Sequence, residues 1–357
     1  MPIPHLVWTR CPAPQLVQES ALADGWNRLN TERGDLPFLT AEAMALALEI
    51  FGRGDEQLVV ARHGERIVAM FVLVPQGKLR WTTFQPSQVP LGAWVAEAGL
   101  DLVTLGESLA RHAVGLCLTL SITQIDSRYT PRPAESSPAA VASDYIETGW
   151  VDIEGSFDDY WNSRGKNLRQ NLRKQRNKLA SQGTTTAMHV IRDSQEMAAA
   201  IARYGALESA GWKAQQGTAI HPDNAQGKYY RRLLETAAQR DQAAVYEYLI
   251  DGRSAAMNLC LERNGVLVVL KTTYDESIKL LSPASLLREE ELQAIFREGK
   301  VRRIEYYGRL MEWHTKLTDN KRQLYHLTIY RWPVVRKLAE LRKRPEPDVG
   351  VPAEEAT

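Results

Sequence analysis

Apolar residues gather in short runs that predict β-strands, and one order of elements occurs twice along the chain. In the first half, residues 57–74 predict two strands joined by a turn, and residues 78–85 predict a third. A helical pattern at 102–115 and an apolar run at 117–125 follow. This half is therefore expected to contain three strands, a helix and a further strand.

The second half repeats this order. Residues 244–262 predict two strands around Asp251-Gly252, a dipeptide typical of tight hairpins. Residues 265–275 predict a third strand, and a helix at 282–299 and a strand at 302–308 follow. Three antiparallel strands and a helical crossover to another strand form an α+β unit, a mixed sheet flanked by helices.

Composition divides the chain into parts. Residues 130–145 are rich in Pro, Ala and Ser and predict a linker or surface loop. We expect one unit at 1–129 and a second at 146–335, with a disordered tail at 344–357.

A basic helix is predicted at 157–183, ahead of the second set of strands. Its apolar stripe and its basic residues occupy different faces, and no acidic residue lies among the basic ones. The stripe consists of Trp161, Leu168, Leu172 and Leu179. A solvated outer face is one interpretation. The other, which we favour, is that Arg169, Arg173 and Arg176 bind an anionic partner: the 3′-phosphate region of a nucleotide carrier, a nucleotide sugar, a tRNA or a membrane surface.

Charge and cysteine content narrow the possible functions. The net charge of +1 indicates no general attraction to nucleic acid. The three cysteines lack metal or redox spacing, so no metal site is expected. The start of the chain lacks the pattern of a signal peptide, and no apolar run could cross a bilayer. We expect a cytoplasmic protein, with peripheral attachment to the inner membrane left open.

The turn at Ser282-Pro283-Ala284-Ser285 enters the helix that follows the third strand. Ser282 suits an N-cap and Pro283 the first helical position, so a plain capped helix explains these residues. The small residues also predict a phosphate cradle, because unpaired N–H groups at a helix start attract anions.

The order of elements resembles the Gcn5-related N-acetyltransferase (GNAT) core, in which this helix start holds the diphosphate of coenzyme A. The glycine-rich Q/R-x-x-G-x-G/A motif of that superfamily is absent here. A narrower resemblance is carried by NLRQNLRKQRNKL, LESAGWKAQQGTAI, YDESIKLLSPASLL and RRIEYYGRLMEWHTKLTD. These blocks resemble the CelD/BcsL acetyltransferases of cellulose biosynthesis, which are related to FemAB-like aminoacyltransferases with two GNAT units in one chain. That family commonly has Ser-Pro-Gly where this chain has Ser282-Pro283-Ala284.

Candidate catalytic residues follow from the strands and from this resemblance. Glu305 is the first candidate for the base that takes a proton from an amine, followed by Glu208 and His314. Ion pairing of Glu305 with Arg303 or Lys271 is the alternative. Tyr307 is the candidate proton donor to a leaving thiolate, or else a half-buried strand aromatic.

The resemblance also implies binding residues. The donor is expected along Lys271, Thr272 and Thr273, where a backbone N–H could stabilise an oxyanion, and at residues 282–285. Trp212, Lys213 and Lys316 are the candidates for contact with the acceptor. Trp212 is equally compatible with a core position.

These observations predict tandem GNAT-like units that transfer an acyl group, expected to be acetyl, from a coenzyme A thioester to an amine. The acceptor would be a small molecule, a sugar or a cell-envelope precursor. Two alternatives remain: aminoacyl transfer from tRNA, as in FemAB-like proteins, and a non-catalytic binding module of exopolysaccharide machinery.

Overall fold

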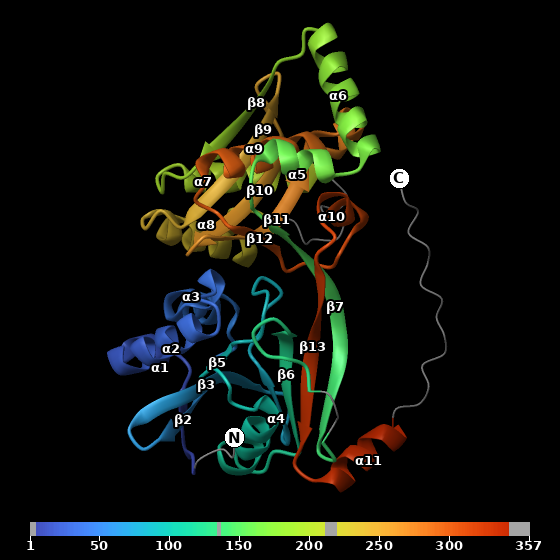
Figure 1. Ribbon diagram of the computed structural model, residues 1–357. Coiled ribbons are helices and arrows are strands. Elements are labelled where there is room, and N and C mark those ends of the chain that lie inside the picture. The colour runs from blue at the N-terminus through green and yellow to red at the C-terminus, as the bar shows by residue number, and fades with distance from the viewer. Residues whose placement is uncertain (1–4, 134–136, 211–219, 343–357) are drawn as a thin grey trace.

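A computed structural model describes residues 5–133, 137–210 and 220–342, and in it both halves of the chain share one 13-stranded mixed sheet (Figure 1). The strands, in the order in which they lie side by side, are β1 (Val7–Pro12), β2 (Gln57–His63), β3 (Arg66–Pro75), β4 (Arg80–Thr83), β6 (Thr119–Asp126), β13 (Lys321–Tyr330), β7 (Ala140–Asp152), β12 (Arg303–Tyr306), β11 (Val266–Tyr274), β10 (Arg253–Arg263), β9 (Ala243–Ile250) and β8 (Thr186–Ile191), while β5 (Trp94–Ala96) pairs with β3.

Helices cover both faces of this sheet. The first half contributes α1 (Gln15–Gln18), α2 (Ser20–Glu32), η1 (Pro37–Leu39), α3 (Ala41–Phe51) and α4 (Leu102–His112). The second contributes α5 (Phe157–Ser163), α6 (Lys166–Ser181), α7 (Met197–Ala210), α8 (Ala225–Ala238), η3 (Glu276–Leu281), α9 (Pro283–Glu298), α10 (Glu312–Leu317) and α11 (Pro333–Arg342). Helices α7 and α8 pack on one face of the second set of strands, and α9 packs on the other. Within the described residues, no helix is long and apolar enough to cross a membrane.

The predicted order of elements is confirmed in both halves. Strands β9 and β10 form an antiparallel hairpin around Asp251 and Gly252. Both residues have positive φ, 47° and 74°, as a tight turn of this type requires. Strand β11 continues the antiparallel sheet, and the crossover through α9 returns to β12, which runs parallel to β11.

The predicted linker at 130–145 is wrong at its end, because residues 140–145 belong to β7. Strand β7 pairs with β13 along most of its length and then with β12. Backbone pairing with β13 holds the segment at 140–145, whose Ala and Ser content concealed the strand. The tail predicted at 344–357 lies outside the described residues.

The single helix predicted at 157–183 is also wrong, because it is divided into α5 and α6. Arg164 is extended between them, with φ of −78° and ψ of 162°, and Gly165 precedes the first residue of α6. The predicted apolar stripe does face the core, where Leu172 and Leu179 are buried and Trp161 and Leu168 pack at its edge.

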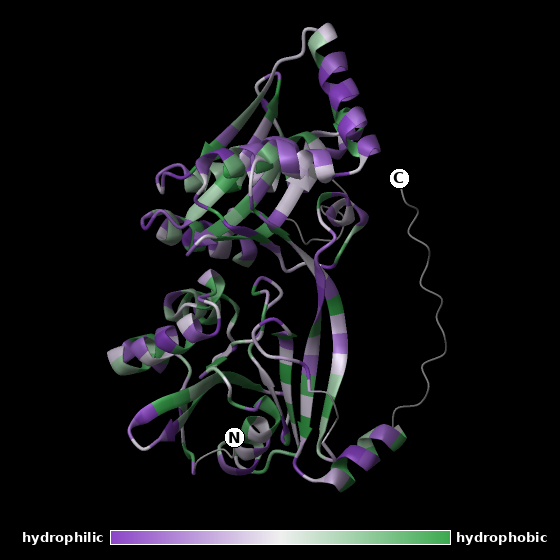
Figure 2. Cartoon of the chain, in the orientation of Figure 1, coloured by the Kyte–Doolittle hydropathy of each residue, from purple (hydrophilic) through white to green (hydrophobic). Residues whose placement is uncertain are grey.

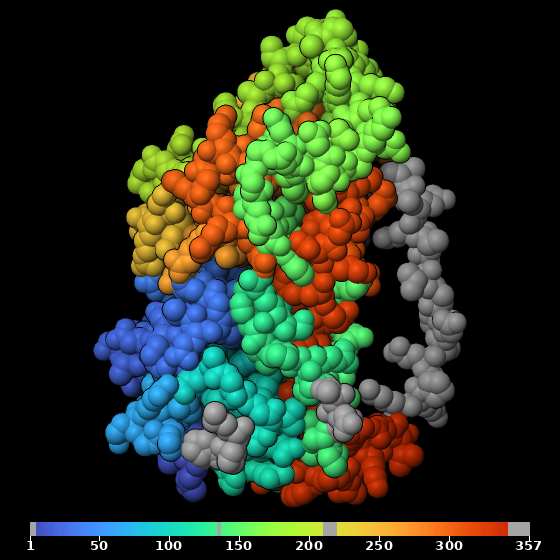
Figure 3. All heavy atoms as spheres, in the orientation of Figure 1, coloured from blue at the N-terminus to red at the C-terminus, as the bar shows by residue number. Residues whose placement is uncertain are grey.

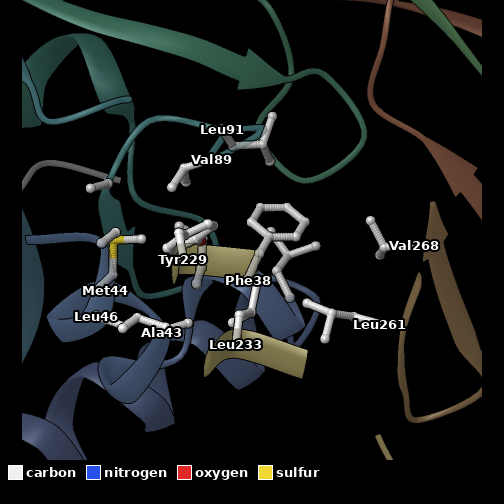
Figure 4. Packing of buried hydrophobic residues seen from close by; sticks show 14 of the residues in the cluster. Phe38, Ala43, Met44, Leu46, Val89, Leu91, Tyr229, Leu233, Leu261 and Val268 are labelled. Carbon is white, nitrogen blue, oxygen red and sulfur yellow. The ribbon is translucent and has the colours of Figure 1, made fainter. Parts of the chain in front are cut away.

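One hydrophobic cluster joins the two halves. It unites Phe38 and Leu46 of the first half with Tyr229, Leu233 and Leu261 of the second (Figure 4). In the space-filling view the N-terminal helices lie directly against the second half (Figure 3). The two units therefore share a core rather than being connected only through the chain.

Candidate functional site

A cleft opens where β11 and β12 diverge. Their parallel pairing runs from Val266↔Arg303 to Val269↔Tyr306, and β11 then continues to Tyr274 paired only with β10 among the described residues. Beside this opening, next to the first turn of α9, lies a cleft of about 700 Å³. That volume suits a small-molecule ligand.

Most of the residues predicted to hold the donor line this cleft. They are Thr272, Thr273, Ser282, Pro283, Ala284 and Ser285. Residues of α7, η3 and α10 complete its wall, among them Glu208, Lys279 and Trp313. The structure therefore brings the end of β11 and the start of α9 together, as the sequence predicted.

The start of α9 differs from the predicted cap. Ser282 has left-handed backbone angles, φ 55° and ψ 43°, and its side chain makes no capping hydrogen bond. Its carbonyl instead accepts from the N–H groups of Ser285 and Leu286. Pro283 occupies the first helical position, as predicted. Within the described residues the Ala284 N–H makes no backbone hydrogen bond, which leaves one amide at the positive end of the helix for an anion.

Arg288 and Trp313 belong to the site although sequence reasoning missed them. The Arg288 guanidinium lies 3.7 Å from the centroid of the Trp313 ring, a cation–π contact. Burial lowers the pKa of Arg288. Among the described residues this guanidinium forms no salt bridge or side-chain hydrogen bond, so its donors remain for a ligand. The helical spacing from Ala284 to Arg288 was a usable signal, since residues four apart share a face.

Glu208 of α7 also lines the cleft and is buried. One carboxylate oxygen accepts the Ile220 N–H at 2.8 Å, and the other lies 3.2 Å from Lys271 Nζ. Tyr204 donates its hydroxyl to the same carboxylate at 3.4 Å. These contacts fix the position and orientation of the carboxyl group. Lys271, predicted as a donor-site residue, is not among the residues that line the cleft; it contacts Glu208, which is.

Comparison with known proteins agrees with this geometry. Residues 166–315, which include the cleft residues of α7, β11, α9 and α10, match a family model described as an acetyltransferase (GNAT) domain. The fold is GNAT. No curated protein matches the sequence.

Solved structures resemble the chain over most of its length. The C-terminal domain of a protein provisionally described as a lysylphosphatidylglycerol synthetase from Agrobacterium fabrum is 16% identical, with a TM-score of 0.52, over 83% of this chain and 90% of that one. A conserved protein of unknown function from Bacteroides thetaiotaomicron is 12% identical, with a TM-score of 0.50, over 88% and 97%. A tandem GNAT protein from the clavulanic acid biosynthesis pathway is 16% identical, with a TM-score of 0.48, over 92% and 99%. At these identities the likeness concerns the fold alone.

Glu305, the first candidate base, does not line the GNAT cleft. Its buried carboxylate lies 2.8 Å from Arg322 Nη2 and within 4 Å of Arg128 and Arg303. Burial raises the pKa of Glu305 to about 7, against the opposing effect of Arg322. Alternation along β12 correctly predicted that Glu305 and Arg303 lie on one face of the strand. That face meets Arg128 and Arg322 rather than the cleft. The alternative interpretation, an ion pair with Arg303, fits this placement.

Tyr307 and His314 also lie away from the cleft. Tyr307 is buried against Phe38, 5.3 Å between ring centroids, and burial raises its pKa well above the usual range. His314 accepts the Met311 N–H on Nδ1 at 2.8 Å, closing the first turn of α10. Burial lowers the pKa of His314 to about 4, so the ring is neutral at physiological pH. The predicted roles of proton donor and base therefore lack support from geometry.

The residues predicted to bind an anion or the acceptor have separate positions. Arg176 is held by Glu289 at 2.8 Å and Glu290 at 2.6 Å, which corrects its assignment to an external partner. Arg169 bonds to Asn162 Oδ1, and Arg173 is exposed. Lys316 pairs with Glu312 outside the cleft. Trp212 and Lys213 lie outside the described residues.

The first half has no equivalent anion site at its crossover helix. Asp101 caps α4, and its carboxylate accepts the Thr104 N–H at 2.8 Å. A diphosphate at this position would meet a carboxylate. Among the residues described, no group of three or more His, Cys, Asp or Glu side chains could hold a metal ion.

Proposed function

We propose that the chain transfers an acyl group, acetyl being the expected one, from a coenzyme A thioester to an amine, using the cleft between β11 and α9. One observation carries this proposal. In a GNAT fold, the Ala284 N–H at the start of α9 and the guanidinium of Arg288 one turn later are both left available for a ligand by the described residues. Both groups favour a diphosphate.

The residues present fit such a donor despite the absent glycines. Ala284 N–H and Arg288 would hold the diphosphate, and Lys279 of η3, exposed at the rim, adds a second cation. The free edge of β11 offers Thr272 and Thr273 to the rest of the carrier. The thioester supplies an activated acyl group.

Glu208 is the residue placed to accept the proton of the attacking amine. An amine attacks only when neutral, and a carboxylate can take its proton directly or through water. Lys271 and the Ile220 N–H fix the orientation of the Glu208 carboxyl group. Lys271 is thus a positioning residue.

The acceptor class remains the broad one inferred from the sequence, an amine of a small molecule, a sugar or a cell-envelope precursor. The resemblance of four sequence blocks to CelD/BcsL acetyltransferases supports the sugar among these. The GNAT domain match does not extend to that narrower family.

Calorimetric titration with acetyl-coenzyme A tests the donor site. We expect one site per chain, because Asp101 occupies the equivalent helix start of the first half. Arg288→Ala should weaken binding at least about tenfold, as expected for loss of a charge-assisted phosphate contact. Arg297→Ala, an exposed residue of the same helix, is the matched control and should bind normally. Absence of binding to the unmodified chain would overturn the proposal.

Aminoacyl transfer from tRNA is a second candidate, favoured by one feature of α6. Four of its cations are exposed and carry no ion pair among the described residues: Lys166, Arg173, Lys174 and Lys178. Binding of aminoacyl-tRNA that is lost when these four become Gln, with no response to acetyl-coenzyme A, would favour this candidate.

A further inference from the structure

Helix α11 carries an apolar face that the rest of the described chain leaves uncovered. Val334, Leu338 and Leu341 are 57%, 55% and 82% exposed, and their spacing of four and three residues places them on one face. Trp332, just before the helix, is 47% exposed. Large apolar side chains gathered in this way mark interaction surfaces more often than scattered single ones.

Basic residues are frequent in the sequence of this helix and directly beside it. The sequence from 331 to 344 contains six basic residues and one acidic residue, an excess of five in a chain whose net charge is +1. The basic residues are Arg331, Arg336, Lys337, Arg342, Lys343 and Arg344. The one acidic residue, Glu340, is already paired with Arg336 at 2.8 Å.

The surface extends beyond the helix. A groove of about 770 Å³ lies between α11 and the strands of the first half, lined by Leu79, Leu118, Val335 and Leu338, with Lys78 and Arg80 also in its wall. Leu116, 58% exposed, follows Gly115, whose carbonyl accepts from Arg331. Apolar and basic side chains therefore alternate across this end of the molecule.

Helix α6 provides an internal contrast. It is more basic than α11, but its buried leucines, Leu172 and Leu179, face the core, and most of the helix is coloured hydrophilic in Figure 2. Helix α11 combines both kinds of residue, and the two helices lie at opposite ends of the molecule (Figure 1). Of these two helices, α11 is the one that combines exposed apolar residues with basic ones, the combination that holds amphipathic helices at bilayer surfaces.

We propose that α11, with Trp332 and Leu116, docks on the surface of an anionic phospholipid bilayer. Trp332, Leu338 and Leu341 enter the boundary between headgroups and acyl chains, while Lys78, Arg80 and Lys337, which are exposed, contact lipid phosphates. A second copy of this chain would fit the α11 surface less well than an anionic bilayer. A twofold interface would set the same patch against itself and oppose two surfaces that each carry this positive excess.

This docking is independent of the proposed acyl transfer and is tested without it. The full chain is mixed with vesicles of phosphatidylcholine, or of phosphatidylcholine with phosphatidylglycerol, and separated by flotation. We expect binding to the anionic vesicles, weakened by salt, and little binding to the neutral ones. The combined change Trp332→Ser, Leu338→Ser and Leu341→Ser should lower the bound fraction at least about tenfold.

Two controls make the result interpretable. Val7→Ser removes an equally exposed apolar residue of β1 and should leave vesicle binding unchanged. The triple variant should keep its melting temperature, because its three side chains are exposed. Equal binding by the triple variant and the unmodified chain would overturn the proposal. A dimer that the triple variant loses, without any vesicle binding, would overturn it in favour of self-association.

Discussion

Glu208 and Glu305 are both buried carboxylates held by cations, yet only Glu208 lines the cleft. We expect Glu208→Gln to lower kcat by about 10²–10⁴, the usual contribution of a general base, with little change in donor affinity. Glu305→Gln is the matched control, since it neutralises a carboxylate of similar burial outside the cleft. Steady-state kinetics that show the larger loss for Glu305→Gln would contradict this assignment.

Glu291 of α9 predicts a pH dependence of stability. Burial raises its pKa from 4.5 to about 7, against a hydrogen bond from Asn258 at 2.7 Å. Between these pH values the folded protein holds a proton that the unfolded chain releases, so stability falls as pH rises through this window. Glu291→Gln should remove the contribution of Glu291, leave the similar one of Glu305, and gain about 3 kcal/mol relative to the unmodified protein between pH 5 and 8.

Urea unfolding of both proteins, the unmodified one and Glu291→Gln, at about pH 5 and about pH 8 measures this difference in stability. Asn258→Ala alone should lower stability at both pH values, because it removes the hydrogen bond and not the titration. Parallel pH profiles for the unmodified protein and Glu291→Gln would show that another group is responsible.

For single residues, the sequence predicted which ones lie at the site better than it predicted what each one does there. The small residues at 282–285 and the strand end at Thr272 and Thr273 were predicted at the site, because their chemistry is local. The role of Glu305 could not be predicted, because Arg322 and Arg128, far along the chain, decide it. Trp313 and Arg288 meet only after α9 and α10 pack together.

At the scale of elements, β6, β12 and β13 meet at a buried network of charges. Arg322 of β13 donates twice to Asp126 of β6, at 2.7 Å each, and lies 2.8 Å from Glu305 of β12. Arg322→Met should destabilise the protein by about 3–5 kcal/mol, because two carboxylates would be left buried without their main cation.

Denaturant unfolding measures that loss, and Arg309→Met, at an exposed residue, should change stability by less than about 0.5 kcal/mol. Adding Asp126→Asn and Glu305→Gln to Arg322→Met should recover part of it, since neither carboxylate then remains buried without Arg322. An unchanged denaturant midpoint for Arg322→Met would show that this network does not stabilise the arrangement of these strands.

Periodicity predicted the elements themselves more reliably than their limits. The hairpin at Asp251-Gly252 has a strong local signal, whereas the break at Arg164 and the start of β7 at Ala140 depend on packing and on distant strand partners. The place of β13 could not be predicted from its own sequence either, because its partners, β6 and β7, come from distant parts of the chain. Lying between them, β13 joins the two halves of the sheet.

At the scale of the whole molecule, the shared core predicts cooperative unfolding. Phe38, Leu46, Tyr229 and Leu233 pack across the two halves (Figure 4). We expect one calorimetric transition for the chain, and Phe38→Ala should lower the unfolding free energy by about 3–5 kcal/mol while the transition remains single.

Leu341→Ala, at an exposed position, should leave that transition unchanged. Two separate transitions in the unmodified protein would show that the halves fold as independent units despite their contact.

The central place of β13 also has a consequence for biosynthesis. The strand spans Lys321–Tyr330 and is made after the other strands of the described sheet, so β6 has no described partner on that side until β13 arrives. The first unit therefore leaves the ribosome with an open strand edge that invites wrong partners. We infer that chains made only as far as residue 320 keep this edge open, and that pairing of β13, not completion of either half, is the step that closes the sheet.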